Sequence, residues 1–573
     1  MQRTIRAAMC AAALAAACGL ALGQTAGVAT AKPEVVSAPL PLAQEPPLSL
    51  AQQIAALVSQ PAVARAHWGV MVTTLDGRPI YALNEAQLFQ PDSNAKLFTT
   101  AAAMALLGPH QRFTTRIEYG SVGSKDKTIY GDIVIIGTGD GNLSSNDFPY
   151  HTPGETKNAP EAEIPPLHYL IEVADEIAAA GVKRLKGDVI GDDTVFPWEP
   201  YPQGWSIDDM VWGYGAPVSG LSIGDNQIRV TVRPGRTAAE WPTLEWQAGI
   251  PAYFQVDAGA LFTGPAKSGN HVQMAREVGS KALRIYGSIA VDAPPDSEEI
   301  AIADPAEFAA IALKELLEER GVRVDGKAVS KHRFVYQGPG FMEESRQDLP
   351  KLPAVPMSAG LSSILTGLVS CSDACPVMLQ HTSPQVLDDV VLTNKISQNL
   401  HAELLLHHLG KTYGEAYADG DGGVDGSTAE GVRVVRQFLV NAGIDKDDFV
   451  FYDGSGLSGY DLVTPRAVAK LLSYAAHDPK TGAPQPWFAA WKASLPIGGV
   501  DGTLADRFTT APLKGHVFAK TGTHSEGRAL SGYLDCASGQ TVIFSILVDH
   551  HLPGDNADRD AMDKIVAAIA AAE

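Results

Sequence analysis

Residues 91–108 read PDSNAKLFTTAAAMALLG, and the interpretation of the whole chain depends on this stretch. Ser93 stands three positions before Lys96, at the predicted start of an apolar helix. Residues three apart share a face of a helix, and a serine near a helix N-terminus lies near free backbone N–H groups. A lysine buried among apolar neighbours has a lowered pKa and can accept the serine's proton. The pattern suits a nucleophilic serine with a lysine base, but an ordinary helix start uses the same residues.

A second S-x-x-K sequence runs from Ser124 to Lys127. It lies in a charged, turn-like stretch that no apolar helix follows, so we interpret it as a surface loop. A single short motif of this kind is weak evidence for a catalytic site. The interpretation of Ser93 therefore rests on the rest of the chain.

Two further motifs follow in the C-terminal half. Ser397-Gln398-Asn399 opens a predicted helix, and Lys520-Thr521-Gly522 ends an apolar strand just before Thr523. Each motif also has copies in predicted loops or turns, at Ser144-Ser145-Asn146, Ser268-Gly269-Asn270 and Lys480-Thr481-Gly482. The order S-x-x-K, S-x-N, K-T-G, each in suitable local structure, is far more specific than any one of the three.

The N-terminus is typical of an export signal. Arg3 and Arg6 precede a short run of small apolar residues, and Ala29-Thr30-Ala31 is a suitable cleavage sequence. We expect residues 1–31 to be a signal peptide and residues 32–48 a proline-rich linker, with the protein exported to the periplasm or cell envelope. An N-terminal membrane anchor is the alternative, although the run is short for a span of ~20 residues.

Charge and cysteine content narrow the possible partners. The formal net charge of −21 argues against nucleic acid and anionic membrane surfaces. An anionic substrate would need a local cluster of positive charge. Cys371 and Cys375 are four apart, and whether they form a local disulfide stays open. We expect Cys536 to be a buried strand thiol.

The order of predicted elements indicates an interrupted domain. Both ends of the 573-residue chain carry strands and helices, including a hairpin at Asp76-Gly77-Arg78 and a helix capped by Thr464 and Pro465. Between them lies a long β-rich stretch with a helix that ends at Gly321. An insertion into one α/β domain is the simplest account.

The ordered motifs resemble the signature of the active-site serine penicillin-recognising enzymes, which include penicillin-binding proteins and serine β-lactamases. The 304 positions from Ser93 to Ser397 far exceed the spacing of a minimal β-lactamase. GTGDGNL at 137–143, DGSGLSGYDLVTP at 453–465 and FAKTGTHSEGRALSGYL at 518–534 look like the penicillin-binding protein 4 type of D-alanyl-D-alanine carboxypeptidase/endopeptidase, a low-molecular-mass class C penicillin-binding protein. The resemblance covers about residues 50–555.

The sequence departs from that family pattern in two places. GTGDGNL lacks the proline of the usual G-G-G-D-P-T-L, and Asp461 stands where asparagine is common. Neither departure touches the three motifs.

The resemblance implies an α/β (α+β) fold built on a β-lactamase/transpeptidase-like catalytic domain, with an antiparallel sheet flanked by helices. Residues 49–112 and 346–573 would form this domain. Two β-rich domains would be inserted between S-x-x-K and S-x-N, at about 113–235 and 236–345.

The resemblance also implies a role for each motif residue. Ser93 would attack the carbonyl between two D-alanines, and Lys96 would take its proton. Ser397 would relay a proton to the leaving amine, while Asn399 would hold Lys96 and the substrate amide. Lys520 would support the proton network.

A second group of residues would bind the end of the substrate. With Lys520, the substrate-binding residues would be Thr521, Gly522 and Thr523, facing the terminal carboxylate. The backbone N–H groups of Ser93 and Thr523 would form the oxyanion hole.

The implied function is a serine-type D-Ala-D-Ala carboxypeptidase and DD-endopeptidase that acts on peptidoglycan stem peptides and cross-links through an acyl-serine. β-Lactams would acylate it, and it would need neither a metal nor an organic cofactor. A serine β-lactamase or esterase and a non-catalytic peptidoglycan-binding protein are the alternatives. The balance of the two peptidase activities, stem-peptide position three, the oligomeric state and any association with the membrane surface or cell wall stay open.

Other polar clusters have rival interpretations. HAELLLHHLG brings His401, Glu403, His407 and His408 together, but it contains no H-E-x-x-H, so packed helix residues are favoured over a zinc site. GTGDG lacks the G-K-[ST] that nucleotide binding needs. Ser455 and Ser458 lie in a Gly-rich turn, and we interpret them as structural or cleft-lining.

Overall fold

The computed structural model describes residues 48–146, 148–152, 164–334, 339–349, 352, 377–414, 426–524, 526–552, 554 and 556–573. The expected signal peptide and all but the last residue of the expected linker lie outside these residues. Cys371 and Cys375 lie outside them too, so their pairing stays a prediction. Cys536 is a buried free thiol, as expected, but it lies just after the strand Gly527–Asp535 and not within it. In the described part of the chain, no helix has both the length and the apolar character that a membrane crossing requires.

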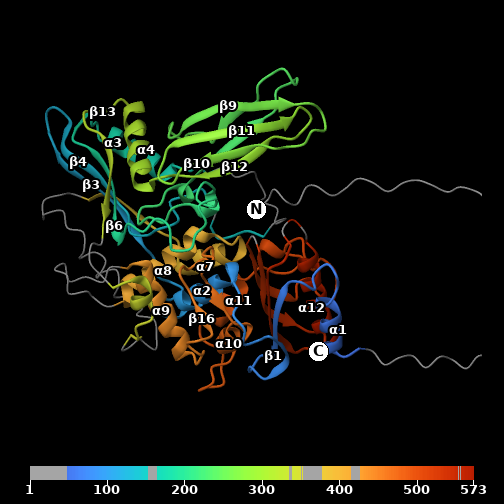
Figure 1. The fold of residues 1–573 in the computed structure, drawn as a ribbon. Coiled ribbons are helices and arrows are strands. Elements are labelled where there is room, and N and C mark those ends of the chain that lie inside the picture. The colour runs from blue at the N-terminus through green and yellow to red at the C-terminus, as the bar shows by residue number, and fades with distance from the viewer. Residues whose placement is uncertain are drawn as a thin grey trace, which may run out of the picture.

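The two ends of the chain together form one unit, which we call the main domain (Figure 1). Its helices are α1 (Leu50–Val58), α2 (Ala95–Leu106), α5 (Phe341–Ser345), α7 (Val386–Lys395), α8 (Asn399–Tyr413), α9 (Thr428–Asn441), α10 (Pro465–Ala476), α11 (Phe488–Ser494) and α12 (Ala557–Ala572). Its strands are β1 (His67–Thr74), β2 (Pro79–Leu83), β16 (Phe449–Val450), β17 (Leu462–Val463), β18 (Val517–Thr523), β19 (Gly527–Asp535) and β20 (Thr541–Asp549).

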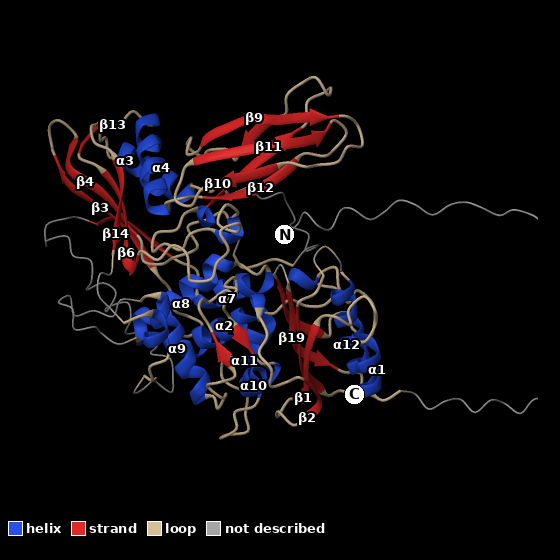
Figure 2. Cartoon of the chain, in the orientation of Figure 1, coloured by secondary structure: helices blue, strands red, loops and turns tan. Residues whose placement is uncertain are grey.

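An antiparallel five-stranded sheet in the order β18-β19-β20-β1-β2 is the centre of the main domain. β1 and β2 form the expected hairpin, and Gly77 provides the positive φ of 84° that its turn needs. β20 lies inside the sheet and is buried from Val542 to Asp549, because helices cover both faces. α1 and α12 pack on one face, and α10 lies against the other (Figures 1 and 2).

Helix α2 is enclosed by the main domain. Its alanines Ala101, Ala102 and Ala103 are fully buried, and their small side chains let α7 and α8 approach closely. Leu97 and Phe98 join the same hydrophobic core, which reaches the sheet through Tyr533 and Leu547. The helix that follows Ser93 is therefore a rigid, water-excluded support.

The chain between α2 and α7 adds two β-rich units, which together we call the insert. The first has a seven-stranded sheet with two helices packed on it: β3 (Thr114–Val122), β4 (Thr128–Ile136), β5 (Arg184–Lys186), β6 (Val189–Pro197), β13 (Arg323–Val324), β14 (Ala328–Arg333) and β15 (Val377–Thr382), with α3 (His168–Ala179) and α4 (Pro305–Glu319). The second has two three-stranded sheets: β7 (Gln227–Arg233), β8 (Thr243–Trp246), β9 (Gln255–Gly264), β10 (Gln273–Arg276), β11 (Ala282–Ala290) and β12 (Asp296–Ala301).

Strand pairing suggests domain limits that differ from the expected ones. β15 pairs antiparallel with β3, from Thr382 opposite Thr114, although residues 346 onward were expected to belong to the catalytic domain. β7 pairs with β12, so a strand expected in the first inserted domain joins the second. We propose that the first unit comprises β3–β6, α3, α4, β13, β14 and β15, and that the second comprises β7–β12.

The expected fold class is confirmed. The main domain is an antiparallel sheet flanked by helices, and β-rich units separate Ser93 from Ser397, as the sequence predicts.

Candidate active site

Ser93 lies in a 3₁₀ turn, Asp92–Asn94, that leads directly into α2. The turn is tightly packed, because a Cβ on Gly522 would lie 2.8 Å from the Cβ of Asp92. A Cβ on Gly456 would lie 1.8 Å from the carbonyl oxygen of Asp92. Glycine at these two positions lets β18 and the loop after β16 press against the turn, which fixes Ser93 at the junction.

The side chain of Lys96 is fully buried beside Ser93. Its Nζ donates to Ser93 Oγ at 3.0 Å, to Asn399 Oδ1 at 2.6 Å and to the Ser455 carbonyl at 2.7 Å. Burial lowers the pKa of Lys96 to about 8, although nearby carboxyls, chiefly Asp453 and Glu403, oppose the shift. A lysine in this state can be unprotonated near neutral pH and lies within reach of the serine hydroxyl.

Ser397 and Lys520 form a second serine–lysine pair. Lys520 Nζ donates to Ser397 Oγ at 2.9 Å and to the Thr521 carbonyl at 2.9 Å. Ser397 has a φ of 63°, in the left-handed region, so its placement costs about 1–3 kcal/mol that its surroundings must offset. Lys520 is fully buried, and burial, with the charge of Lys96, lowers its pKa well below the usual value.

Asn399 begins α8 and links the two sides of the site. Its Oδ1 accepts from Lys96, while its Nδ2 donates to the carbonyl of Tyr214 at 2.8 Å. The two contacts fix the orientation of the amide. Tyr214 belongs to the insert, so the insert takes part in holding this residue.

The three residues that follow Lys520 line the outer part of the site. Thr521 Oγ1 lies 2.7 Å from Thr503 Oγ1, and Thr523 Oγ1 donates to the Gly522 carbonyl at 2.7 Å. Thr523 is exposed at the end of β18, whereas Gly522 is buried against Asp92. The strand therefore presents hydroxyl groups beside a buried lysine.

All the sequence-predicted residues of the three motifs meet at this place, through contacts among themselves or with their immediate neighbours. Two of the decoy motifs lie elsewhere, whereas Asn146 of the Ser144-Ser145-Asn146 decoy shares the acceptor Asp225 with Gln398. Ser124 is in the exposed turn between β3 and β4, and Lys480 is in an exposed turn after α10.

Several contacts at the site could not be predicted from residue types. The carbonyls of Ser455 and Tyr214 are backbone groups, so no residue type marks them. His524 follows Thr523 and lies 3.7 Å from Asp209 of the insert, whose other oxygen accepts from the Tyr214 hydroxyl at 2.8 Å. One segment of the insert thus touches both Asn399 and the end of β18.

Carboxyl groups are buried beneath Lys96. Asp453 accepts from Trp205 Nε1 at 2.9 Å and from the backbone N–H of Gly456 and Ser458. Burial and the charge of Asp453 raise the pKa of Glu403 to about 8, and the same two causes raise that of Asp461 well above its usual value. A protonated Asp461 can donate a hydrogen bond to Asp453, which accounts for an aspartate where asparagine is common.

The polar residues weighed as a zinc site have other partners. His401 Nδ1 lies 2.9 Å from Asp389, His407 Nδ1 lies 2.7 Å from the Gly426 carbonyl, and His408 Nε2 lies 3.0 Å from the Gly139 carbonyl. Glu403 accepts from the backbone N–H of Gly454 at 3.0 Å. Across the described ranges, no group of three His, Cys, Asp or Glu side chains is arranged to hold a metal ion.

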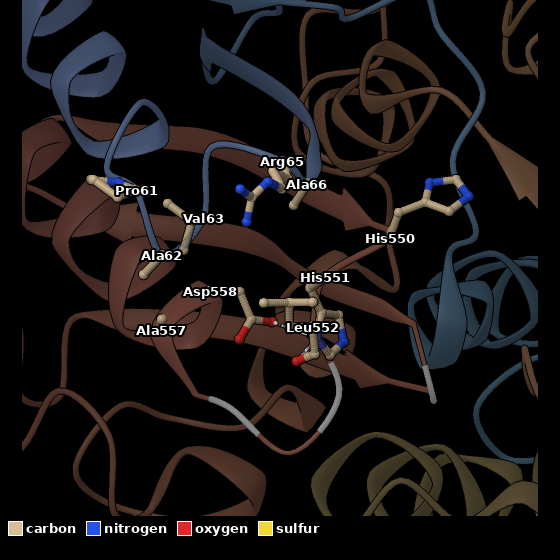
Figure 3. A pocket seen from close by; sticks show the side chains of 10 residues that line it. All are labelled: Pro61, Ala62, Val63, Arg65, Ala66, His550, His551, Leu552, Ala557 and Asp558. Atoms are coloured by element: carbon tan, nitrogen blue, oxygen red, sulfur yellow. Dashed lines mark hydrogen bonds and ion pairs between the residues drawn. The ribbon is translucent and has the colours of Figure 1, made fainter.

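A separate hollow of about 40 Å³ lies where the segment after α1 meets the segment after β20 (Figure 3). Arg65 and His550 lie at its edge, and Asp558 lies on the opposite side beside His551. Pockets for organic ligands usually measure about 300–1,000 Å³. The hollow contains none of the motif residues, and we assign it no ligand.

Comparison with known protein families shows which family this chain belongs to. The model of the "D-Ala-D-Ala carboxypeptidase 3 (S13) family" matches residues 50–352 and 360–572. The chain belongs to the S13 family. The family expected from the motifs is therefore confirmed, and with it the expectation of a serine-type D-Ala-D-Ala carboxypeptidase.

Individual relatives of the chain are consistent with its place in the S13 family. The chain is 30% identical over 522 residues to the "D-alanyl-D-alanine carboxypeptidase" of Actinomadura sp. (strain R39), which covers 89% of this chain and 82% of that protein. It is 22% identical to the D-alanyl-D-alanine carboxypeptidase DacB of Haemophilus influenzae, over 81% of each chain. The crystal structure of penicillin binding protein 4 from Haemophilus influenzae matches with a TM-score of 0.67 at 20% identity, over 90% of this chain and 98% of that one, which supports the fold.

Proposed function

We propose that this S13 family member hydrolyses peptides that end in D-Ala-D-Ala, and cross-links of the same chemistry, through an acyl-enzyme on Ser93. The observation that carries the proposal is the 3.0 Å contact between Lys96 Nζ and Ser93 Oγ, made by a lysine that is fully buried. With a pKa of about 8, about a tenth of Lys96 is unprotonated at pH 7 and ready to act as a base.

In the first step, the Ser93 hydroxyl proton passes to Lys96 Nζ while Oγ bonds to the carbonyl carbon between the two D-alanines. The carbonyl oxygen becomes an oxyanion that the backbone N–H groups of Ser93 and Thr523 would stabilise. Loss of one such donor typically costs ~10²–10³ in rate. Asn399 keeps Lys96 aimed at Ser93, because its Oδ1 accepts from the same Nζ at 2.6 Å.

In the second step, the C–N bond breaks and the leaving amine takes a proton. Ser397 is suited to deliver that proton, since its hydroxyl bonds to Lys520 Nζ at 2.9 Å. Water then attacks the acyl-serine and releases the shortened peptide. A β-lactam would acylate Ser93 in the same way, with its own ring amide as the bond that breaks.

The substrate's terminal carboxylate needs positive charge, which is scarce in a chain of net charge −21. We propose that Lys520, Thr521 and Thr523 bind it, and that the charge of the bound carboxylate raises the lowered pKa of Lys520 so that the lysine pairs with it as a cation. Gly522 allows the close packing of the strand. Peptidoglycan stem peptides carry such a carboxylate, so we propose that the protein works outside the cytoplasm on the cell wall. Neither a metal nor an organic cofactor has a part in these steps.

Intact-mass measurement after brief exposure to benzylpenicillin, with peptide mapping, tests the proposal. A penicilloyl adduct on the peptide that carries Ser93 is expected. Rapid loss of penicillin without an adduct would indicate a β-lactamase instead, and intact penicillin without an adduct would contradict acyl-serine chemistry altogether.

A further inference from the structure

The insert contacts α8, the helix that Asn399 begins, at several points along its length. At its start, Asn399 Nδ2 donates to the Tyr214 carbonyl. Two turns further on, His408 lies against Gly139, where a Cβ would come within 2.7 Å of His408 Nε2. Gly139 and Gly141 of the GTGDG sequence thus allow close packing against α8, whereas Gly137 lies against Gly220 and Leu221 within the insert.

His401 lies between these two contacts and is almost wholly buried. Its Nδ1 lies 2.9 Å from Asp389 of α7, and its Nε2 lies 3.6 Å from Asp225 of the insert. A Cβ on Gly141 would come within 3.2 Å of its ring. The imidazole is thus enclosed between a carboxylate of the main domain and a carboxylate of the insert.

The two carboxylates keep His401 charged. Burial alone lowers the pKa of His401, but the ion pair with Asp225 and the hydrogen bond and charge of Asp389 raise it to about 10. Asp140 lies near enough for the charge of His401 to lower its pKa, but burial has the larger effect and raises that pKa to about 7. At neutral pH the contact between α8 and the insert is therefore an ion pair shielded from water.

Asp225 also reaches the S-x-N motif itself. It accepts from Gln398 Nε2 at 3.3 Å and from Asn146 Nδ2 at 3.0 Å. Gln398 is the residue between Ser397 and Asn399, so Asp225 contacts the chain on both sides of Asn399. Asp225 itself is held in a 3₁₀ turn of the insert, Gly224–Asn226, with a φ of 55°.

We propose that Asp225 is a positioning residue of the insert, which acts through His401 and Gln398 to hold Ser397 and Asn399 in place for acyl transfer. Ser397 has a left-handed backbone, which persists only where surrounding contacts enforce it. Asn399 holds the base, so a small shift of the α8 start moves both Ser397 and Lys96 relative to Ser93. The inference rests on the proposed acyl-serine function.

The test is the Asp225→Asn variant of the full-length protein. Asparagine is nearly the same size and tolerates the left-handed backbone, so the variant removes the charge and turns one of the two acceptor oxygens into an N–H donor. We expect the limiting rate of acylation by benzylpenicillin to fall at least about tenfold, since a misplacement of about 1 Å can cost ~10² in rate. The concentration for half-maximal acylation rate should change less than about threefold, because the penicillin-binding surface is unchanged.

The chain offers a matched control. His332 in the insert also lies between two carboxylates, Asp193 at 3.0 Å and Asp304 at 3.1 Å, but it contacts none of the three motifs. Asp193→Asn should lower the melting temperature and leave the acylation rate unchanged. Acylation at the wild-type rate by Asp225→Asn, or an equal loss in both variants, would overturn the inference.

A second variant covers the case in which Asp225→Asn does not fold. His401→Gln keeps a hydrogen-bonding side chain but removes the charge, and it should show the same fall in limiting rate. A wild-type rate in a folded His401→Gln protein would also contradict the inference. If the wild-type protein itself is not acylated, the proposed function fails and not merely the role of Asp225.

Discussion

The Nζ of Lys96 lies 2.6 Å from Oδ1 of Asn399, although 303 positions of the chain separate the two residues. Nearly all of that separation is the insert and the segment that follows it. The bond forms because α8 packs against α2 inside the main domain. The alignment of the proposed base thus depends on contacts made after the chain has returned from the insert.

Replacing Ser93, the proposed nucleophile, should abolish acylation. Ser93→Ala removes the only atom that can form the ester in the proposed mechanism, so no penicilloyl adduct should be detected by mass spectrometry. Ser124→Ala changes the other S-x-x-K sequence, which lies in the exposed turn between β3 and β4, and should be labelled like the wild type. Equal labelling of the two variants would rule out the assignment of Ser93.

Acylation should depend on pH through Lys96. The proposed base is active only when unprotonated, so the second-order rate of penicillin acylation should rise about tenfold per pH unit below pH 8 and level off above it. Stopped-flow measurement between pH 5.5 and 9.5 tests this expectation. A flat profile across pH 8 would show that Lys96 does not act as the base.

Removing Lys520 should weaken recognition of substrates with a free terminal carboxylate. We expect Lys520→Ala to lower kcat/KM for such peptides by at least about 10²-fold, because it loses a charged partner and the bond to Ser397. Lys480→Ala, in the second K-T-G sequence, should keep wild-type turnover. Normal turnover of Lys520→Ala with a normal melting temperature would contradict its role.

Asp461→Asn should stabilise the protein. Burial raises the folded pKa of Asp461 well above 3.8, so the folded state binds more protons than the unfolded state above that value, and stability falls as pH rises. Asparagine keeps the donor to Asp453 but has no proton to lose. The melting temperature should therefore rise more at pH 8 than at pH 5, as measured by differential scanning calorimetry.

The same substitution at Asp453, the carboxylate beside Asp461, should change the melting temperature in the opposite direction. Asp453→Asn replaces an acceptor of several buried donors, including Trp205 Nε1, with a group that carries its own N–H. It should lower the melting temperature at both pH values, because a buried donor left without an acceptor costs about 1–3 kcal/mol. A gain in stability for Asp453→Asn, or a loss for Asp461→Asn, would contradict the assignment of Asp461 as the protonated donor and Asp453 as the acceptor.

Much of this architecture follows from local sequence. The helix at Pro465–Ala476 begins where Thr464 and Pro465 predict, and the Thr464 hydroxyl accepts from the Ala467 N–H. The motif at Ser93 could be separated from its decoy at Ser124 because only one of the two precedes an apolar helix. Patterns of this kind are set by neighbours within a few residues.

Other features depend on partners far along the chain. The sequence alone predicts no strand at Val377–Thr382, since β15 exists only through its pairing with β3. The Tyr214 carbonyl could not be predicted because every residue has such a group. Asp225 looks like an ordinary turn residue until the fold brings it to His401.

The pairing of β15 with β3 determines how the insert could be deleted from this protein. Thr114 and Thr382 are partners at one end of that ladder, so the polypeptide leaves for the insert and comes back at nearly the same spot. A gene that joins the two flanking segments would need only a short linker. Its product would keep the five-stranded sheet and all three motifs, yet it would lack Tyr214 and Asp225. Removing the insert would therefore require little rerouting of the chain, but Asn399 would lose its hydrogen bond to the Tyr214 carbonyl.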